Sequence, residues 1–540
     1  MPYDAILFFV TLILVGLCVQ LHLQGHPRTL PLTALMLLIC GLSLYGYSNY
    51  GRWFSISPKD AVYTQVRGNQ PLKTYMHWHE MYHYYLGAKY FPELGYNGLY
   101  EAVVLADAQS AHPVRTTNEI RSLREPTRPI SVNEALQRAQ AEFRPRFTDA
   151  RWEEFGRDLE QFKSFALPGW LDTGLFDAGY NPPPSWAVIG YTVANLVPID
   201  QAAAWFDGRP SWYQMEFLPW FDVLLLAIIA AMIWRTFGFP VFTAFLLLFA
   251  TSQVASYGWI SGSFFRYTWF FGLAGGLCLL ARHRWFLAGV FMGLAAVDRI
   301  FPIVFLAGAA LPLFIGWIKQ RDQWRPFVKF VLGAMLMIYL MVAISLALFG
   351  WEMWQAFFQK IALHKEMFFV HHIGYRRIAV FADWVPGQNF WWGDGLRRFA
   401  VWNAKLVDSW HQQEQRHLPF MAILVVSAFI AAWRIKPEEA ALLFGGVVLF
   451  LFAIPANYYY IYFPLVAVVL LAAEKSPLRD MLIVALFLLW AYLRLAPALS
   501  RDDLVQNYYI CWGFLIFFTL WPLLRSYETI QHWLSSPKRG

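Results

Sequence analysis

The chain has 540 residues, 58% of them hydrophobic and only 15% charged, and its formal net charge is +7. Soluble domains average about 45–50% apolar and about 25% charged residues, so this composition excludes an ordinary soluble protein. Most of the positive charge lies in short loops between apolar runs, a pattern typical of cytoplasmic loops in membrane proteins, and it predicts no nucleic-acid partner.

Apolar runs follow one another along the chain and predict an all-α polytopic membrane protein with about 13 transmembrane helices in the lipid bilayer. The runs lie near residues 4–22, 32–49, 216–234, 239–257, 267–282, 285–297, 301–317, 326–349, 417–433, 439–456, 457–474, 480–498 and 507–524. The first run has neither a basic leader nor a small-residue cleavage site, so we expect a retained span and not a signal peptide.

The basic short loops predict the orientation of the spans. With residues 282–284, 319–329, 434–436 and 475–479 in the cytoplasm, the N-terminus and both long loops lie outside. The predicted division is residues 1–49 for the first two transmembrane helices, 50–215 for a large extracytoplasmic loop with amphipathic or interfacial helices, 216–349 for a transmembrane bundle with a broken hairpin, 350–416 for a second extracytoplasmic loop, and 417–540 for the C-terminal transmembrane helices and a short cytoplasmic tail. We expect an integral protein of a bacterial inner membrane whose active site faces the periplasm or exterior.

Two regions depart from simple membrane crossing. Residues 285–297 and 301–317 are short for spans and predict a broken hairpin, whose non-helical tip at membrane depth is tolerated only where it lines a cavity or packs in protein. Residues 185–199 are apolar, but a span there would break the charge alternation, so an interfacial or re-entrant helix is expected.

The first long loop carries helix signals of its own. Ser131-x-x-Glu134 is a capping-box pattern that predicts the start of a helix. Aromatic and aliphatic residues recur at helical spacing between Asp149 and Phe165 and predict a second helix. We expect its apolar stripe to pack against the membrane or against the core of the loop.

Residues 79–83 read HEMYH, a literal match to H-E-x-x-H. On a helix this spacing puts His79 and His83 on one face beside Glu80, and in zinc proteases such imidazoles bind the metal while the glutamate acts as general base. Glu101, 18 residues beyond His83, is loosely compatible with a third ligand. Intramembrane metalloproteases carry the motif within a span, whereas here it lies in an outer loop, so a zinc protease is kept as the alternative.

The same stretch also supports a carboxylate acting without metal. Glu80 falls in a predicted short helix, residues 75–91, with Tyr84, Gly87 and Ala88 on roughly the same face. Such a small-residue patch beside an acid predicts room for a ligand.

Cationic side chains are predicted at the same outer level. Arg266 follows Gly262 by four residues at a helix end, and Arg299 sits at the broken hairpin, where an arginine at membrane depth is a functional-site hypothesis. The second long loop adds Lys365 and Arg376 among several tryptophans. Arginine suits phosphate because its planar fork binds two oxygens at once.

The layout resembles the GT-C-fold glycosyltransferases, which are polytopic enzymes that use polyprenyl-phosphate-linked sugars. The resemblance lies in four places: Glu80–Tyr90 followed by Leu99-Tyr100, Asn181-Pro182-Pro183-Pro184, Gly262-x-x-x-Arg266, and Ala288-Gly289 through Arg299-x-Phe301-Pro302. It implies a GT-C-like fold and an inverting transfer from a polyprenyl-phosphate-sugar donor to a glycan, lipid or protein acceptor.

The resemblance also implies roles for single residues. In the family an acid of the first outer loop is the general base, and Glu80 matches it. The family usually has Asp there and one preceding span, so the alternative acids are Asp60, Glu101 and Asp107. The residues implied to hold the donor phosphate are Arg266, Arg299, Lys365 and Arg376, and those implied to line the pocket are His79, His83, Tyr84 and Asn181. No cofactor is assigned with certainty, and a divalent cation on His79 and His83 stays an alternative.

Two further classes compete with an enzyme. A transporter predicts inverted repeats and ionisable residues along a midplane path, and the sequence shows no repeat. A non-catalytic membrane scaffold is the other alternative, because a fold alone does not determine function.

Overall fold

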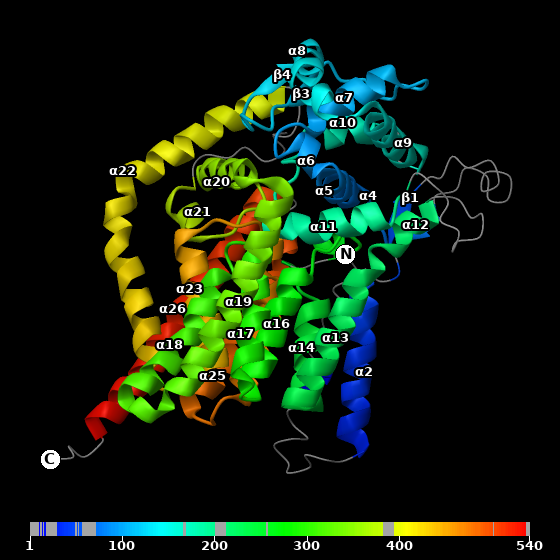
Figure 1. Cartoon of the computed structure of the whole chain (residues 1–540). Helices are drawn as coiled ribbons and strands as arrows, with labels where there is room; N and C mark the ends of the chain where they lie inside the picture. Colours follow the sequence, from blue (N-terminus) through cyan, green and yellow to red (C-terminus); the bar gives the residue numbers. More distant parts are fainter. Residues whose placement is uncertain are drawn as a thin grey trace.

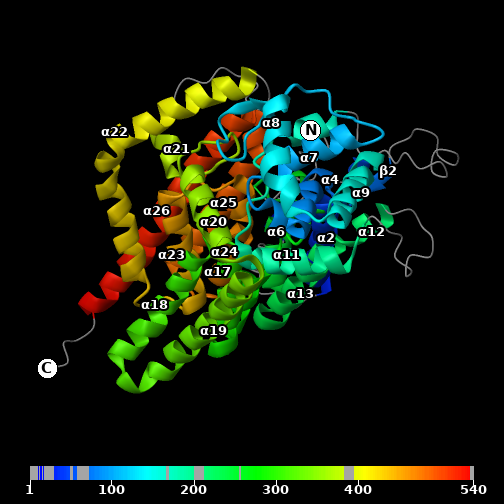
Figure 2. The same cartoon turned by 45° about the horizontal axis from the view of Figure 1, so that its top comes forward.

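The computed structural model describes residues 30–48, 53–56, 72–165, 169–199, 212–254, 257–381, 394–500 and 502–535, with isolated positions before residue 52. In these residues the chain is mostly helical, and its only sheets are two antiparallel pairs of three-residue strands. Figure 1 shows a bundle of long helices with a group of shorter helices over one end. We call this group the outer region and the end of the bundle that it covers the outer end. Figure 2 gives the same arrangement with the outer region brought forward.

Five helices in the described ranges are long and apolar enough to cross a bilayer. They are α2 (Leu30–Tyr47), Met215–Phe237 with α13 (Trp220–Phe237), Arg321–Phe349 with η5 (Arg321–Gln323) and α19 (Trp324–Phe349), Pro477–Pro497 within α25 (Pro477–Leu499), and α26 (Asp503–Ser535). Shorter apolar helices accompany them: α14 (Phe239–Ala250), α16 (Thr268–Ala281), α17 (Trp285–Asp298), α18 (Ile303–Lys319) and Asn457–Ala472, which joins η6 (Asn457–Tyr462) to α24 (Phe463–Ala472). These helices support a membrane protein. The number of 13 spans stays a prediction, because several helices are short and residues 4–22 lie mostly outside the described residues.

Every apolar run after the first has its centre in a helix. Where the sequence predicts a broken hairpin, the structure has two helices, α17 and α18, joined by the turn at residues 299–302. Whether this pair stops short of crossing the membrane stays a prediction. α17 approaches α19 so closely that a Cβ on Gly289 would lie 2.0 Å from the carbonyl oxygen of Phe330. In a bilayer the hydrophobic effect does not drive helices together. Small residues at their contacts let the backbones come close enough to be held by van der Waals attraction.

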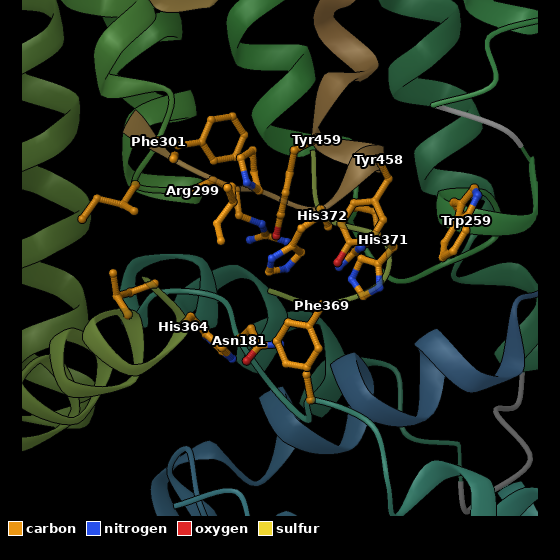
Figure 3. A pocket seen from close by; sticks show the side chains of 18 of the residues that line it. Asn181, Trp259, Arg299, Phe301, His364, Phe369, His371, His372, Tyr458 and Tyr459 are labelled. Atoms are coloured by element: carbon orange, nitrogen blue, oxygen red, sulfur yellow. The ribbon is translucent and has the colours of Figure 1, made fainter. Parts of the chain in front are cut away.

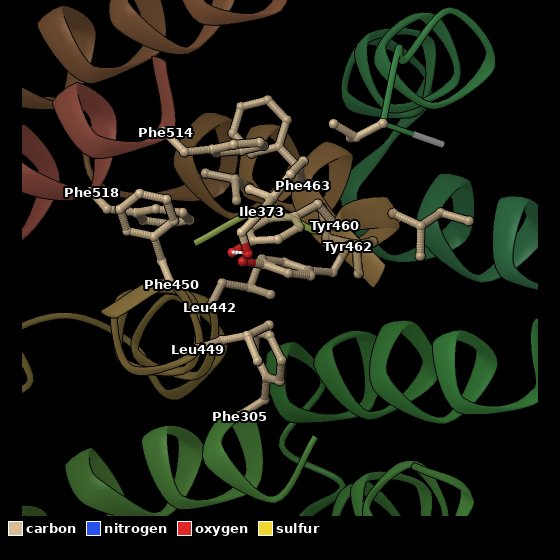
Figure 4. Packing of buried hydrophobic residues seen from close by; sticks show 14 of the residues in the cluster. Phe305, Ile373, Leu442, Leu449, Phe450, Tyr460, Tyr462, Phe463, Phe514 and Phe518 are labelled. Atoms are coloured by element: carbon tan, nitrogen blue, oxygen red, sulfur yellow. Dashed lines mark hydrogen bonds between the residues drawn. The ribbon is translucent and has the colours of Figure 1, made fainter. Parts of the chain in front are cut away.

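Aromatic packing holds the outer end of the bundle (Figure 4). Phe450 of α23 (Pro437–Phe452), Tyr460 of η6, and Phe514 and Phe518 of α26 form one buried cluster. The ring centres of Tyr460 and Phe514 are 4.6 Å apart, and those of Phe514 and Phe518 are 5.8 Å apart. Each such pair contributes about 0.5–1.5 kcal/mol beyond its buried area. The cluster anchors the segment between α23 and η6, which forms part of the cavity described below.

The outer region is built mainly from the first long loop. Its elements are β1 (Phe54–Ile56), β2 (Leu72–Thr74), α4 (Trp78–Met81), η1 (Tyr82–Leu86), α5 (Gly87–Lys89), α6 (Phe91–Leu94), α7 (Leu99–Gln109), β3 (Glu119–Arg121), β4 (Pro129–Ser131), α8 (Val132–Arg138), η2 (Ala139–Phe143), η3 (Arg144–Arg146), α9 (Asp149–Phe165), α10 (Trp170–Gly174), α11 (Pro184–Leu196) and α12 (Trp212–Phe217). The predicted cap is confirmed, because Ser131 Oγ accepts the backbone N–H of Glu134 at 3.1 Å. α9 has the predicted bounds, and its Phe155, Leu159 and Phe162 are buried in the core of the outer region.

The helix predicted over residues 75–91 begins later and is not uniform. It starts at Trp78, and residues 82–86 form a π-helical turn, a feature common at functional sites. The apolar stretch 185–199 contains α11, which Figure 1 shows lying across the outer ends of the bundle helices. An interfacial position of this helix stays a prediction.

The second long loop contains α20 (Trp351–Lys365), α21 (Tyr375–Ala379) and the start of α22 (Asp394–Ala431). The predicted boundary at residues 416–417 lies inside α22, because this helix continues through Pro419 without a break. The loop and the following apolar run are therefore connected by one 38-residue helix, which runs along the side of the bundle (Figure 1).

Candidate functional site

One cavity of about 520 Å³ lies between the outer region and the outer ends of the bundle helices. Figure 3 shows Arg299, Phe301 and Tyr459 on the bundle side, with Asn181 and His364 opposite them. The cavity wall brings together nine residues that the sequence singles out: His79, Glu80, His83, Tyr84, Asn181, Arg266, Arg299, Lys365 and Arg376. They come from five segments that are far apart in the chain.

Glu80 is positioned by the start of its helix. His77 precedes α4, and its Nδ1 accepts the backbone N–H of Glu80 at 3.3 Å. The backbone N–H of His77 donates to the carbonyl of Gly262 at 2.8 Å, which ties this helix start to the turn before Arg266. The side chain of Glu80 is 17% exposed, and its Oε2 lies 3.5 Å from Nη1 of Arg266.

Arg266 is held by a carboxylate that caps its turn. Asp222 of α13 accepts the backbone N–H of Arg266 at 3.1 Å and that of Tyr267 at 3.3 Å. The preceding residue, Phe265, has φ +53, a strained backbone for a bulky side chain and a feature that concentrates at functional sites. The guanidinium carbon of Arg266 lies 4.5 Å from the centre of the Tyr84 ring, and Tyr458 covers it at 4.7 Å.

Arg299 occupies the tip of the broken hairpin. Its Nη1 donates to the carbonyl of Asp298 at 2.7 Å and lies 3.8 Å from the Asp298 carboxylate. Oδ1 of the same carboxylate accepts the hydroxyl of Thr268 at 2.7 Å, so the tip is joined to the first residue of α16. The indole of Trp186 in α11 lies 5.4 Å from the Arg299 guanidinium.

A third group joins the H-E-x-x-H histidines. Nε2 of His79 lies 3.1 Å from Oδ2 of Asp177, and Nδ1 of His83 lies 3.8 Å from the same oxygen. One ligand atom from each of the three residues can be chosen so that all lie within 4.8 Å of one another, a spacing that suits a metal ion. Two histidines and a carboxylate are donors that zinc and similar divalent ions accept.

His83 is, however, already saturated by protein groups. Its Nδ1 lies 2.9 Å from the carbonyl oxygen of His79, and its Nε2 lies 2.9 Å from the hydroxyl of Tyr100. A metal ion would have to displace one of these partners. The three residues fit a cation by chemistry, and their present hydrogen bonds equally fit a metal-free network.

Burial and charge give the two histidines different protonation. Burial lowers the pKa of His83 to about 4, so this imidazole is neutral at pH 7. Burial also opposes a charge on His79, but the hydrogen bond and the charge of Asp177 outweigh it and raise the pKa of His79. Burial works against ionisation of Asp177 too, and the two histidines still lower the pKa of this carboxyl.

The His79–Asp177 pair predicts a pH-dependent stability. Because the pKa of His79 is raised, the stability that the pair adds to the fold is fully present below about pH 6.5 and is lost as the pH rises through the raised pKa. Because the pKa of Asp177 is lowered, its part of this stability is fully present above about pH 3.8. We expect Asp177→Asn to lower the melting temperature more at pH 6 than at pH 9, measured by a thermal-shift assay of the protein in detergent. Equal losses at both pH values would contradict the pair.

Two of the alternative acids, Glu101 and Asp107, do not lie on the cavity wall. Glu101 is fully buried within α7, where burial raises its pKa to about 7, and its carboxyl does not line the cavity. Asp107 accepts the backbone N–H of Val114 and pairs with Lys163 at 3.0 Å, which is a structural role. Asp60 lies outside the described residues. Asp177, and not Glu101, is the group that joins the two histidines.

The ligand space predicted beside Gly87 and Ala88 is wrong. A Cβ on Gly87 would lie 2.6 Å from the ring of Tyr180, and a Cβ on Gly190 of α11 would lie 2.8 Å from that of Ala88. These small residues let Tyr180 and α11 approach the helix. The cavity opens on the side of Glu80 and Tyr84 instead.

The second long loop supplies the remaining wall. Nη1 of Arg376 donates to the carbonyl of Lys365 at 3.0 Å, and the rings of Phe368 and Trp410 flank its guanidinium at 5.4 and 5.1 Å. Lys360 of α20, whose pKa burial lowers to about 7, donates to the carbonyl of Tyr180 at 2.9 Å. This bond joins α20 to the segment that carries Asp177 and Asn181.

Several cavity residues were not assigned a role from the sequence. They are His77, Asp177, His364, His371, His372, Tyr458 and Tyr459. Burial lowers the pKa of His364 to about 3 and that of His371 to about 4, so both are neutral hydrogen-bonding groups at pH 7. The pair Tyr458-Tyr459 lies at the start of an apolar run, where aromatic residues usually indicate only a membrane interface.

Comparison of the chain with protein-family models, curated proteins and solved structures finds no match. A functional conclusion therefore depends on the chemistry of this cavity.

Proposed function

We propose that the chain is a membrane glycosyltransferase of the GT-C type. It transfers a sugar from a polyprenyl-phosphate donor to a glycan, lipid or protein acceptor, with inversion at the anomeric carbon. The reaction takes place on the extracytoplasmic side, which in a bacterial inner membrane is the periplasmic face. The observation that carries the proposal is a single cavity whose wall combines Glu80 with four cationic side chains, Arg266, Arg299, Lys365 and Arg376.

Each part of this wall matches one requirement of the transfer. Glu80 takes the proton of the acceptor hydroxyl as its oxygen attacks the anomeric carbon. The bond from that carbon to the phosphate oxygen breaks, and the polyprenyl phosphate leaves with one more negative charge than it carried as a diester. Cations fixed on the wall stabilise this developing charge. The effect is largest for the cations that are buried and need not reorganise, as the three arginines are.

The residues around Glu80 support its role as the base. Arg266 faces the carboxylate, and the buried Tyr84 supports the guanidinium from one side. Glu80 Oε2 has no hydrogen-bond partner among the described residues, so it is free to accept a proton from a bound hydroxyl. Asn181, whose Oδ1 also lacks a partner there, offers an acceptor for a second hydroxyl of a sugar.

The test is transfer of a labelled sugar by purified protein in lipid. A panel of short-chain polyprenyl-phosphate hexoses and pentoses supplies the donor, and formation of free polyprenyl phosphate reports turnover without knowledge of the acceptor. Donor-dependent release that disappears in Glu80→Gln supports the proposal. No release from any donor, with correctly folded protein, would favour a scaffold or transporter.

The triad of His79, His83 and Asp177 favours a second candidate, a zinc membrane metalloprotease. In that mechanism the glutamate must face a metal-bound water, whereas Glu80 here faces Arg266. The saturated hydrogen bonds of His83 also weigh against it.

Metal analysis separates the two candidates. For the glycosyltransferase we expect less than stoichiometric zinc after purification without added metal, and unchanged sugar transfer after treatment with a chelator. A protease requires about one zinc per chain, bound to the triad and lost in His79→Ala. One tightly bound zinc together with peptide cleavage would replace our proposal.

A further inference from the structure

The cationic residues of the cavity fall into two groups at different places. Arg266 and Arg299 lie with Glu80, and we call this group the base end. Arg376 and Lys365 lie at the junction of α20 and α21, and we call this group the anion end. Figures 1 and 2 agree that α21 lies toward α22, whereas α4, which carries Glu80, lies on the other side of the outer region.

The arginines of the base end already face carboxylates. Arg266 lies 3.5 Å from the carboxylate of Glu80, and Arg299 lies 3.8 Å from that of Asp298. Two positive and two negative groups therefore offset each other here. A phosphate bound at the base end would compete with both carboxylates.

The anion end has no such compensation. Arg376 is 3% exposed, and its Nε and Nη2 are buried without a hydrogen-bond partner in the described part of the chain. The ion pairs of the described residues include none for Arg376 or Lys365, and the neighbouring Glu366 pairs with His411 at 3.1 Å. Glu366 and Glu414 act on Arg376 only at longer range. A buried cation with unused donors is costly unless an anion completes it.

Exposed apolar side chains form another part of the cavity wall. The segment before Arg376 is bound to the end of α23, since the backbone N–H of Ile373 donates to the carbonyl of Pro455 at 2.9 Å. Phe452, the last residue of α23, lines the cavity and is 47% exposed, and Ile300 of the hairpin tip lines it with 40% exposure. A phosphate at the anion end would thus have an apolar exit for an attached hydrocarbon chain.

The stereochemistry of inversion also indicates that the leaving phosphate lies away from Glu80. In an inverting displacement the base and the leaving group act on opposite faces of the sugar ring. In inverting glycosidases the two catalytic carboxyl groups, one on the base side and one on the leaving-group side, are roughly 6.5–9.5 Å apart. Arg266, at 3.5 Å from Glu80, lies on the base side of the ring. The leaving phosphate needs cations farther away.

We propose that the anion end binds a phosphate headgroup carrying an apolar chain, and that Arg266 and Arg299 position Glu80 instead of binding this phosphate. Identifying the phosphate as that of the sugar donor rests on the proposed function. In that case the sugar lies in the middle of the cavity, and the carbon–oxygen bond breaks toward Arg376 and Lys365. The hydrocarbon chain leaves past Phe452 and Ile300.

Binding measured without turnover tests directly whether the anion end binds the phosphate. The probes are farnesyl phosphate, farnesol and inorganic phosphate, titrated by calorimetry into the purified full chain in nanodiscs. We expect farnesyl phosphate to bind well, inorganic phosphate more weakly and farnesol least. Arg376→Gln should weaken the binding of farnesyl phosphate roughly 10- to 150-fold, as expected for the loss of hydrogen bonds to a charged group. Lys365→Gln, at an exposed position, should weaken this binding several-fold.

Arg266→Gln is the matched control, because it removes a buried arginine from the same cavity at the base end. We expect it to lower sugar transfer while farnesyl phosphate binding changes by less than about threefold. Loss of binding in Arg266→Gln with normal binding in both Arg376→Gln and Lys365→Gln would overturn the assignment and leave glycosyl transfer standing. Farnesol binding as tightly as farnesyl phosphate would also overturn it. Arg376-dependent binding without transfer from any sugar donor would instead contradict the proposed function alone.

Discussion

Glu80→Gln should reduce sugar transfer roughly 10²- to 10⁴-fold, the usual contribution of a general base. The amide keeps the size and most hydrogen bonds of the carboxylate but cannot take the proton of the acceptor hydroxyl. The helix start is held by the ring Nδ1 of His77, which accepts the backbone N–H of Glu80, and by the backbone N–H of His77. The substitution touches neither bond, so the protein should still fold and insert. The measurement is release of polyprenyl phosphate per minute at saturating donor.

Glu101→Gln provides the control for Glu80→Gln. Both are glutamates of the outer region, but Glu101 is buried in α7 and does not line the cavity. We expect Glu101→Gln to keep at least half of the wild-type rate. Full activity in Glu80→Gln, or loss in Glu101→Gln with normal folding, would move the base away from Glu80.

Gly262→Ala should cause a comparable loss of sugar transfer, because it displaces the backbone that positions the site. Gly262 has φ +71, and an added Cβ would lie 1.8 Å from the carbonyl oxygen of Tyr75, an overlap that only backbone movement can relieve. The left-handed backbone costs an alanine about 1–2 kcal/mol, and the overlap adds about 1–3 kcal/mol. The carbonyl of Gly262 also accepts the N–H of His77, so the displacement reaches both Glu80 and Arg266.

Gly258→Ala is the matched substitution for Gly262→Ala. It lies four residues earlier, and nothing is within 4 Å of the position that its Cβ would take. We expect Gly262→Ala to lower the melting temperature by several degrees and to abolish transfer, whereas Gly258→Ala leaves the melting temperature unchanged. Equal melting temperatures for the two variants would show that the contact between Gly262 and Tyr75 does not hold the site together.

Local patterns in the sequence determined much of the helical structure. The period of the apolar stripe gave α9 its bounds, and the capping pattern at Ser131 marked the start of α8. Length and hydropathy located the apolar helices, because burial in a core or a bilayer demands continuous apolar residues over many turns. They did not determine how many cross the membrane, since helices such as α16 and α17 are short for a span.

Single site residues were also predictable where chemistry is unusual at a position. A carboxylate beside two histidines and arginines at the ends of apolar helices are costly placements, and all of them line the cavity. The ligand space predicted beside Gly87 and Ala88 was wrong, because a glycine or alanine on a helix face is equally consistent with a ligand and with a closely packed neighbour. Here Tyr180 and α11 are the neighbours.

What the sequence by itself determined is therefore the set of helices and the chemistry of its individual charged groups. Only the tertiary structure decided which charges meet: Asp177 lies with the two histidines and Arg266 with Glu80. Arg376 forms no ion pair within the described part of the chain, and two of its nitrogens lack a partner there. The physical reason is distance. A helical pattern constrains residues three or four positions apart, whereas an ion pair between residues about a hundred or more positions apart depends on how loops pack on the bundle.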